Sequence, residues 1–492
     1  MSIQRKQYLT EQLSEFALTT TYEDLPQEVI HTAKRMLLDS IGCIVDATIA
    51  SERGKGAAKL AKRLGGPPES SIIGTSDKVS CANAAIVSGD ATYATNYDCV
   101  HPDFAHVNPA VVSTSLAIGE SQAVSGKDFL QAFVLGEEVA LRIGSGLQEI
   151  AGISRSQLVH QVYKKTGDGK QEEQHSVVIG DSPAVFGCVA SAGKMLNLSK
   201  SQMASAMGIA GYNTPMPARG HWHASGPEAN AGSAMVRGFS PGWMSHAGIA
   251  ATLLAEVGYT GNVTVLDGPN SFWKFTGAAS WDPEAVTNKM GKEWNILGTC
   301  FKLYPSCGVI HSALDAFKSI VDENHLTPDD IEQVKSWVSP HFLRPICANR
   351  DPINEVHAQF SAPYLYALVA HHIPVGVEWR SLANMTSPKI RAFMGKTTFA
   401  RYDESGPGVK PERDHAKVDV MANGKTYHAE RKFRMGAPMP KEAQVSDNLL
   451  EEKFIHNLAV ILPENKAAEV AKMIWDLENL KDLSQLIQKL HK

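Results

Sequence analysis

The sequence has few cysteines for its length, and no two of them form a Cys-x-x-Cys pair. The seven stand at positions 43, 81, 99, 188, 300, 307 and 347. An odd number without paired spacing argues against a disulfide framework and against a zinc knuckle. The sequence therefore predicts reduced thiols, as in a cytoplasmic protein.

The sequence also lacks a run of 18 apolar residues, and its first 20 residues lack the apolar centre of a signal peptide. We therefore expect no membrane span and no secretion signal. Lysine and arginine (47) do not outnumber aspartate and glutamate (52), and the formal net charge is −5. This balance gives no basic field for nucleic acid or an acidic membrane surface. This net charge still allows a small anion to bind in a local positive pocket.

What the sequence does contain is apolar residues at helical spacing, over most of its length. This pattern predicts a mainly α protein. Small residues dominate 82–94, which suits close helix packing. We expect 51–80 to be a loop with one minor strand and the polar stretch 153–180 to be a surface excursion. Amphipathic or apolar helices are expected over 8–18, 24–44, 129–143, 184–196, 201–210, 246–257 and within 441–492.

The pattern changes to mixed helix and strand near residue 300. A helix over 309–321 is followed by a helix start with Thr327 as N-cap, and then by strand alternation over 331–338. Residues 416–433 predict a β-hairpin around Asn423-Gly424, the pair that favours a type I′ turn.

Together these elements predict two domains. A large all-helical domain is built from both chain ends, residues 1–299 and 438–492. A smaller α+β lid domain, residues 300–437, is inserted between them. A cleft between the two is the expected ligand site.

Polar and titratable side chains gather in 17 residues just before an apolar stretch that begins at Pro109. A buried helix can fix the geometry of such side chains, and its dry surroundings can shift their pKa values. This predicts a small acid/base site, and the alternative is a solvated loop with two incidental histidines. The side chains are Asp90, Asn96, Asp98, His101, Asp103 and His106.

Several motifs, in their order and spacing, resemble the MmgE/PrpD family, which includes 2-methylcitrate dehydratases, cis-aconitate decarboxylases and an iminodisuccinate epimerase. The resemblance implies a helical domain with an α+β lid, a homodimer, no metal or organic cofactor, and a small polycarboxylate substrate. It does not fix the reaction. The motifs are Leu25-Pro-Gln-Glu-Val, Leu37-Leu-Asp-Ser-Ile-Gly42, Asn108-Pro109-Ala110, the helix from His246, Lys302-Leu-Tyr-Pro-Ser-Cys-Gly, His357-Ala-Gln-Phe-Ser-Ala-Pro-Tyr364 and Glu452-Lys-Phe.

The resemblance also assigns roles to residues of the polar loop. His106 takes the place of the family's loop histidine, and Asp98 keeps one acidic position. Asn96 stands where decarboxylases and dehydratases use an acid. Because asparagine cannot titrate, a proton-transfer role at that position is lost.

Further along the chain, the resemblance implies three substrate contacts. Arg237 falls where the family often has a carboxylate-binding lysine, and Lys302 matches the lysine of the lid's first segment. Cys307 falls where the animal decarboxylase has a histidine, although a buried small side chain is the simpler interpretation. The predicted binding set is Asn96, Arg237, Lys302, Cys307 and His223.

Removal of a proton next to a carboxylate creates extra negative charge, which Lys302 and Arg237 would stabilise in a water-poor cleft. His106 is the expected base, since its free pKa lies nearest neutrality, and Asp98 orients it or shuttles a proton. A second acid is needed as well, and the sequence does not choose among the candidates. They are His101, Asp103, His223 and Tyr304.

We therefore expect a cofactor-independent lyase or isomerase, with dehydration of a 2-methylcitrate-like acid as the first candidate. Decarboxylation of cis-aconitate and epimerisation of an amino-dicarboxylate are alternatives. A metal-assisted hydrolase is another, with Asp98, His101, Asp103 and His106 as ligands. The last alternative is a degenerate homologue, marked by Asn96, that binds a dicarboxylate without turnover.

Overall fold

The computed structural model describes residues 7–102, 106–150, 181–215, 240–339, 342–402 and 414–492, together with residue 235 and the backbone of short strands within 153–173. Most of these residues are helical, which confirms the prediction of a mainly α protein. Within those ranges, every helix falls short of the length and apolar character that a membrane span requires. Most of the predicted excursion at 153–180 lies outside the described residues.

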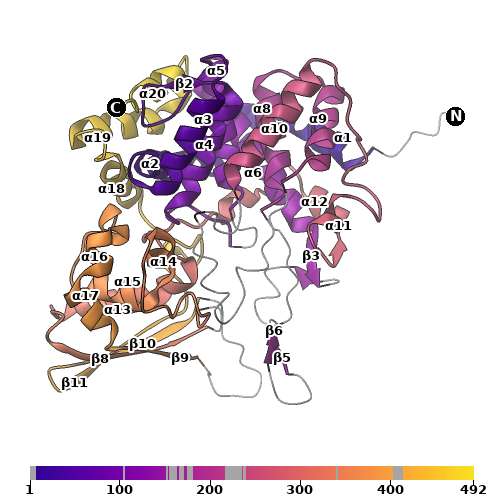
Figure 1. Ribbon diagram of the computed structural model, residues 1–492. Coiled ribbons are helices and arrows are strands. Elements are labelled where there is room, and N and C mark those ends of the chain that lie inside the picture. The colour runs from indigo at the N-terminus through magenta and orange to yellow at the C-terminus, as the bar shows by residue number, and fades with distance from the viewer. Residues whose placement is uncertain are drawn as a thin grey trace.

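A helical body forms the upper part of the molecule in Figure 1. Its longer helices before residue 257, among the described residues, are α1 (Leu9–Thr19), α2 (Gln27–Ala50), α3 (Glu52–Leu64), α4 (Cys81–Ala94), α5 (Asn108–Ser121), α6 (Gly126–Gly146), α8 (Ala184–Met195), α9 (Lys200–Tyr212) and α10 (Pro241–Glu256). Shorter elements are η1 (Tyr22–Asp24), α11 (Phe272–Phe275), α12 (Pro283–Thr287), η4 (Asn295–Gly298) and the strands β1 (Ser70–Ser71), β2 (Lys78–Val79), β3 (Leu147–Ile150), β4 (Ile153–Ser154), β5 (Tyr163–Lys165), β6 (Gln171–Glu173) and β7 (Ser280–Trp281).

Small residues let these helices approach one another backbone to backbone. A Cβ atom on Gly242 of α10 would lie 2.2 Å from the carbonyl oxygen of Ile86 in α4. One on Gly136 of α6 would lie 2.8 Å from the carbonyl oxygen of Gly187 in α8. Larger side chains at these glycines would push the helices apart, so the close packing expected of the small-residue stretches is present.

The chain's C-terminal helices return to this body. They are α18 (Asp447–Leu458), α19 (Glu464–Trp475), η8 (Leu477–Asn479) and α20 (Ser484–Gln488). Helices α18 and α19 pack on α2, and α20 packs on α5, as the yellow ribbons beside the indigo and purple ones show in Figure 1. Buried side chains from both chain ends, such as Leu37 and Phe454, belong to one apolar cluster.

Buried side chains from 304 to 422 form a second apolar cluster around a four-stranded sheet of order β11-β10-β8-β9. Strand β8 pairs antiparallel with β10 and parallel with β9, and α13 packs on β10 and β11. The sheet lies at the lower left of Figure 1. The elements from residue 308 to residue 443 are η5 (Gly308–Ile310), α13 (His311–Glu323), β8 (Ile331–Val338), α14 (Glu355–Phe360), α15 (Ala362–Ala370), η6 (Val377–Arg380), α16 (Leu382–Thr386), α17 (Pro388–Met394), β9 (Thr397–Arg401), β10 (Ala416–Ala422), β11 (Lys425–Arg431) and η7 (Lys441–Ala443).

The predicted hairpin is confirmed, because β10 and β11 are joined by Asn423 and Gly424 with φ values of 50° and 69°. Both lie in the left-handed region that a type I′ turn requires. The domain limits at 299 and 437 stay a prediction.

Two local predictions are wrong. Residues 52–64 form helix α3 and not a loop. Two glycines lower its intrinsic helix propensity, but a Cβ atom on Gly54 would lie 2.1 Å from the carbonyl oxygen of Ala47, so packing on α2 requires a glycine there.

No helix starts at Thr327, whose N–H and hydroxyl donate to the carboxylate of Asp330. The result is a turn that leads directly into β8.

Candidate active site

The polar loop between α4 and α5 is folded against the segment that carries Lys302. The chain leaves α4 through Asn96, whose φ of 55° is left-handed, a conformation that asparagine tolerates better than most residues. Val100 and Cys300 then exchange two backbone hydrogen bonds of 2.8 Å. This bridge brings residues 96–101 beside residues 300–302, which are some 200 positions away in the sequence.

His106 and Asp98 are in direct contact within this loop. The imidazole Nδ1 lies 2.5 Å from Oδ2 of Asp98, a carboxylate that is fully buried. The backbone N–H of His106 donates to Asp181 at 2.8 Å, and the ring of Tyr93 meets the imidazole edge-on, with centroids 4.6 Å apart. The imidazole keeps 17% of its surface exposed. Because Nδ1 faces Asp98, proton exchange with another molecule would run through Nε2.

The surroundings of His106 favour its neutral form. Burial lowers the pKa of the imidazole, and the positive charge of Lys302 adds to this effect. The carboxylate of Asp98 opposes both effects, but the pKa stays below its usual value. A histidine of this kind is neutral at pH 7 and can accept a proton.

Lys302 is 2% exposed and bonds inside the loop. Its ammonium donates to Oδ1 of Asn96 at 2.7 Å, to the carbonyl oxygen of Asn96 at 3.1 Å and to Oδ1 of Asp98 at 3.4 Å. An ammonium has three N–H donors, and these acceptors lie within hydrogen-bond distance of it. The amide Nδ2 of Asn96 is buried and has no acceptor in the described part of the chain. An unpaired buried donor costs free energy and indicates a place for a ligand acceptor.

A second buried lysine lies directly behind the first. Lys453 donates to Oδ1 of Asp39 at 2.6 Å, to the carbonyl oxygen of Tyr97 at 2.7 Å and to that of Lys302 at 3.0 Å. The other oxygen of Asp39 accepts the backbone N–H of Cys99 at 2.7 Å. Lys453 therefore ties α18, α2 and both segments of the site together.

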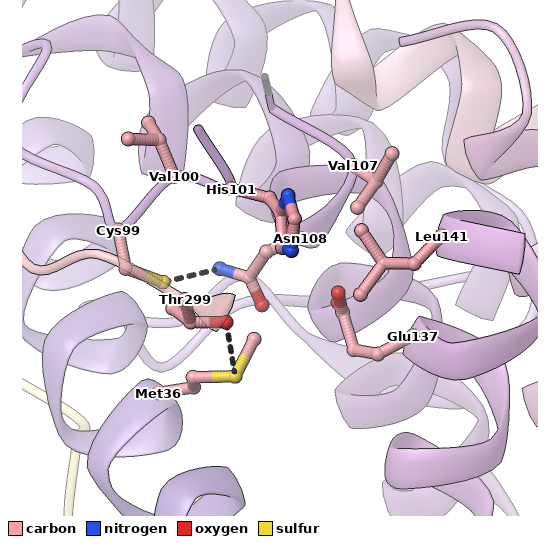
Figure 2. Close-up of a pocket in the computed structure, with 9 residues that line it drawn as sticks. All are labelled: Met36, Cys99, Val100, His101, Val107, Asn108, Glu137, Leu141 and Thr299. Atoms are coloured by element: carbon pink, nitrogen blue, oxygen red, sulfur yellow. Dashed lines mark hydrogen bonds between the residues drawn. The ribbon is translucent and has the colours of Figure 1, made fainter. Parts of the chain in front are cut away.

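A small cavity lies behind the loop, as Figure 2 shows. Its free volume is about 10 Å³, roughly the room that one water molecule needs. Glu137 of α6 and Asn108 of α5 line it, and both carboxylate oxygens of Glu137 and Oδ1 of Asn108 have no hydrogen-bond partner among the described residues. Burial, reinforced by Glu138, raises the pKa of Glu137 well above its usual value. A neutral carboxylic acid at Glu137 fits these surroundings. Its lining is Met36, Cys99, Val100, His101, Val107, Asn108, Glu137, Leu141 and Thr299.

Comparison with known proteins adds an independent observation. The MmgE/PrpD N-terminal domain matches residues 11–283, and the MmgE/PrpD C-terminal domain matches residues 304–479. The chain belongs to the MmgE/PrpD family. Its relatives include the cis-aconitate decarboxylase of Homo sapiens, 26% identical with 94% of this chain and 90% of the relative covered. Others are the cis-aconitate decarboxylase of Aspergillus terreus (24%; 99% and 96%) and the cis-aconitate decarboxylase-like protein oryM of Aspergillus oryzae (25%; 97% and 96%).

Four of the site residues predicted in this MmgE/PrpD protein lie together: His106, Asp98, Asn96 and Lys302. His101 turns away from them, with Nε2 3.2 Å from the carbonyl oxygen of Asn295.

Two other predicted residues lie in the second apolar cluster or at its edge. The hydroxyl of Tyr304 donates to Asp315 at 2.9 Å, and burial raises its pKa well above the usual value. This arrangement gives a poor proton donor, so Tyr304 as second acid finds no support here. Cys307 is half-buried and follows the same segment as Lys302. Asp103, Arg237 and His223 lie outside the described residues.

The predicted metal ligands do not converge where they are described. Asp98 contacts His106, His101 contacts Asn295, and Asp103 is outside the described ranges. Within those ranges, no group of three His, Cys, Asp or Glu side chains is arranged to hold a metal ion.

Sequence reasoning missed Glu137 and Lys453. Glu137 stands one helical turn after Phe133 in a stripe of buried residues, so a carboxylate there was a detectable signal. Lys453 stands in one of the family motifs, but its partner Asp39 is 414 positions away, which no local pattern reveals.

Proposed function

We propose that this protein is a lyase that acts on a small di- or tricarboxylic acid, with His106 as the group that transfers the proton. The observation that carries the proposal is the chain of contacts Lys302–Asp98–His106, which begins in the interior and ends at a partly exposed imidazole. A titratable group held by a buried carboxylate is the usual arrangement of a catalytic base. The protein would need no metal or organic cofactor for this step.

Proton transfer at His106 depends on Asp98. When Nε2 accepts a proton, the imidazole becomes positive, and the carboxylate 2.5 Å from Nδ1 stabilises that charge. In the same way, the imidazolium returns the proton to a carbanion. Asp98 can stay ionised in the interior because the Lys302 ammonium lies 3.4 Å from its other oxygen.

Lys302 acts on the substrate through Asn96 in this proposal. Its donors are directed at Asn96 and Asp98, and it thereby fixes which side of the Asn96 amide carries the oxygen. The opposite side then presents Nδ2, the buried donor that has no described acceptor. A substrate carboxylate or carbonyl oxygen is the kind of group that would complete this hydrogen bond.

The first candidate reaction is loss of CO₂ from a cis-aconitate-like acid. Decarboxylation leaves a carbanion that needs one proton, and His106 in its imidazolium form can supply it from Nε2. Dehydration needs a base and, in addition, an acid for the departing hydroxide. The relatives named as cis-aconitate decarboxylases agree with this order. Dehydration of a 2-methylcitrate-like acid, favoured by the sequence alone, and epimerisation of an amino-dicarboxylate are the other outcomes of the test.

The test is a substrate panel in D₂O followed by NMR, with cis-aconitate, citrate, 2-methylcitrate and amino-dicarboxylates. We expect one acid to lose CO₂, with one deuterium taken up from solvent by the allylic carbanion that remains. Loss of water or inversion would identify the other reactions. The matched control is His106→Gln, checked by circular dichroism for native fold. Absence of any product and of any deuterium exchange in the wild-type protein would refute the lyase proposal. The homodimer implied by the family resemblance and the cytoplasmic location stay predictions.

A further inference from the structure

The ring of Tyr93 lies between a buried arginine and the imidazole of His106. The centroids of the tyrosine and imidazole rings are 4.6 Å apart, and the ring planes meet at 77°. Aromatic pairs prefer such a near-perpendicular arrangement. The guanidinium carbon of Arg53 lies over the Tyr93 ring, 5.3 Å from its centroid. Tyr93 is 6% exposed, so both contacts are shielded from water, where a cation–ring contact is strongest.

Arg53 is fixed by contacts with two other segments. Its Nη2 donates to Oδ1 of Asp90 at 2.9 Å, and its Nη1 donates to the carbonyl oxygen of Met235 at 3.1 Å. Arg53 stands in the first turn of α3, where the helix dipole disfavours a positive charge. The position of this arginine is therefore explained by its tertiary contacts and not by the helix that carries it.

Asp90 is the anchor of this arrangement. It stands three residues before Tyr93 in α4, so the two side chains are neighbours on the helix surface. Besides Arg53, its Oδ1 accepts the hydroxyl of Ser240 at 2.7 Å and the backbone N–H of Gly242 at 3.4 Å. Both donors belong to the start of α10. One carboxylate thus ties α3, α4 and α10 together and holds the arginine over the tyrosine ring.

His106 is held at three points. Its Nδ1 lies 2.5 Å from Asp98, its backbone N–H donates to Asp181, and its ring packs on Tyr93. A single hydrogen bond at Nδ1 leaves an imidazole free to tilt and to turn away from its partner. Contact with a ring that is itself fixed removes this freedom.

We propose that Tyr93 is a positioning residue that holds the imidazole of His106 against Asp98, and that Arg53, anchored on Asp90, holds the Tyr93 ring. The consequence for catalysis rests on the proposed function of His106. The positioning itself does not, because it concerns the state of the imidazole in the free protein.

The tautomer of His106 reports this positioning. A hydrogen bond to the Asp98 carboxylate requires the proton of the neutral imidazole to be on Nδ1, which leaves Nε2 as the acceptor. If the ring turns away from Asp98, the tautomer with the proton on Nε2 becomes populated. A residue that only stabilised the fold would not change the tautomer of a folded protein.

The test is ¹⁵N NMR of the full-length chain labelled at histidine, at about pH 8, where free histidine is neutral. The chain has 18 histidines, and the signals of His106 are those that His106→Gln lacks. We expect the wild-type protein to show the Nδ1–H tautomer alone and Tyr93→Leu to show both tautomers. Tyr93→Phe keeps the ring and should restore the wild-type state.

Tyr22→Leu is the matched control. The Lys127 ammonium lies over the Tyr22 ring, 5.0 Å from its centroid, so this variant also removes a tyrosine ring paired with a cation. We expect His106 to keep the wild-type tautomer in it. Circular dichroism shows which variants are folded. If Tyr93→Leu is not, Tyr93→Met, whose flexible side chain fills irregular gaps, takes its place with the same expectation.

The proposal is overturned if the wild-type protein already shows both tautomers, or if the folded variant without the Tyr93 ring keeps Nδ1–H alone. The role of Arg53 is tested by Arg53→Met made together with Asp90→Asn, so that no carboxylate is left unpaired. Both tautomers should appear in this double variant. Nδ1–H alone would contradict the role given to Arg53.

Kinetics then measure the consequence for turnover. With the acid that the substrate panel identifies, Tyr93→Leu should lower kcat by up to about 100-fold, as a displaced catalytic group does, and KM should change much less. Equal turnover in the variant and the wild-type protein would contradict the positioning role. If the panel yields no product, the lyase proposal fails, while the tautomer result still decides whether Tyr93 positions His106.

Discussion

Two buried lysine–aspartate pairs lie next to each other in this protein, and they differ in where their hydrogen bonds end. The hydrogen bonds of Lys453 and Asp39 end on backbone groups, since the second oxygen of Asp39 accepts the N–H of Cys99. The contacts of Lys302 and Asp98 end on His106, whose side chain can gain and lose a proton. The first pair can only hold the fold together, whereas the second can pass a change of charge to the surface.

The largest expected effect is a loss of turnover when the second pair is cut off from His106. His106→Gln removes the titratable end of the second pair, and general acid–base catalysis typically contributes about 10²- to 10⁴-fold. We expect a loss of this size in kcat/KM, measured with the acid that the substrate panel identifies. The urea midpoint should change little. A variant with normal turnover would show that the proton is transferred elsewhere.

The next largest effect concerns the stability of the first pair. Lys453→Met leaves Asp39 as a buried carboxylate without its counter-charge, and breaking a buried pair in this way costs about 3 to 5 kcal/mol. Urea unfolding followed by circular dichroism measures the loss. Lys127→Met, which removes an exposed cation paired with Glu23, is the control and should cost less than about 1 kcal/mol. Equal losses in the two variants would mean that the interior pair is not a clamp.

A smaller effect is expected at Glu137, which belongs to neither pair. Its pKa is raised in the folded chain, so the unfolded chain releases this proton at lower pH than the folded chain does. Stability therefore falls as the pH rises above about 4.3, the unfolded pKa, until the folded pKa is reached. Glu137→Gln stays neutral and lacks this loss.

The measurement at Glu137 is the free energy of unfolding of both proteins at several pH values. The difference in favour of the glutamine variant should widen by up to about 1.4 kcal/mol for each pH unit in that window. A constant difference from pH 5 to pH 7 would show that Glu137 ionises in the folded chain as it does in the unfolded chain.

The smallest effect is expected at Asn96. Asn96→Asp replaces the unpaired Nδ2 donor by an acceptor and adds a negative charge beside Asp98 and Lys302. We expect KM to rise, and the limb of kcat/KM that reports the ionisation of His106 to move to higher pH, because an added carboxylate favours the imidazolium form of His106. The same kinetics at several pH values measure both. An unchanged KM would remove Asn96 from the substrate-binding role.

Local patterns in the sequence predicted those parts of the fold that local physics determines. Leu9, Leu13 and Phe16 mark a helix by their spacing, and Asn423-Gly424 marks a hairpin by its turn chemistry. Helix α3 was not predicted because Gly54 lowers the local helix propensity. The reason for a glycine at this position is its contact with α2, which the sequence alone does not show.

Some contacts of the candidate site could likewise be predicted from the sequence, and others could not. Asp98 and His106 are eight residues apart in one loop, so their pairing could be predicted from the sequence. The clamp formed by Lys453 and Asp39 depends on segments that only the folded chain brings together. Their residue types were visible in the sequence, but their partners were not.

The central claim is that His106, held by Asp98, exchanges the proton with the substrate. It is tested most directly by kcat/KM against pH for the wild-type protein and Asp98→Asn. Burial outweighs Asp98 and lowers the pKa of His106, so the limb of the wild-type profile that reports the ionisation of His106 should lie below about pH 6.5, the free value. Without the carboxylate, the limb should move to still lower pH. A limb that stays at the same pH in Asp98→Asn would contradict the account.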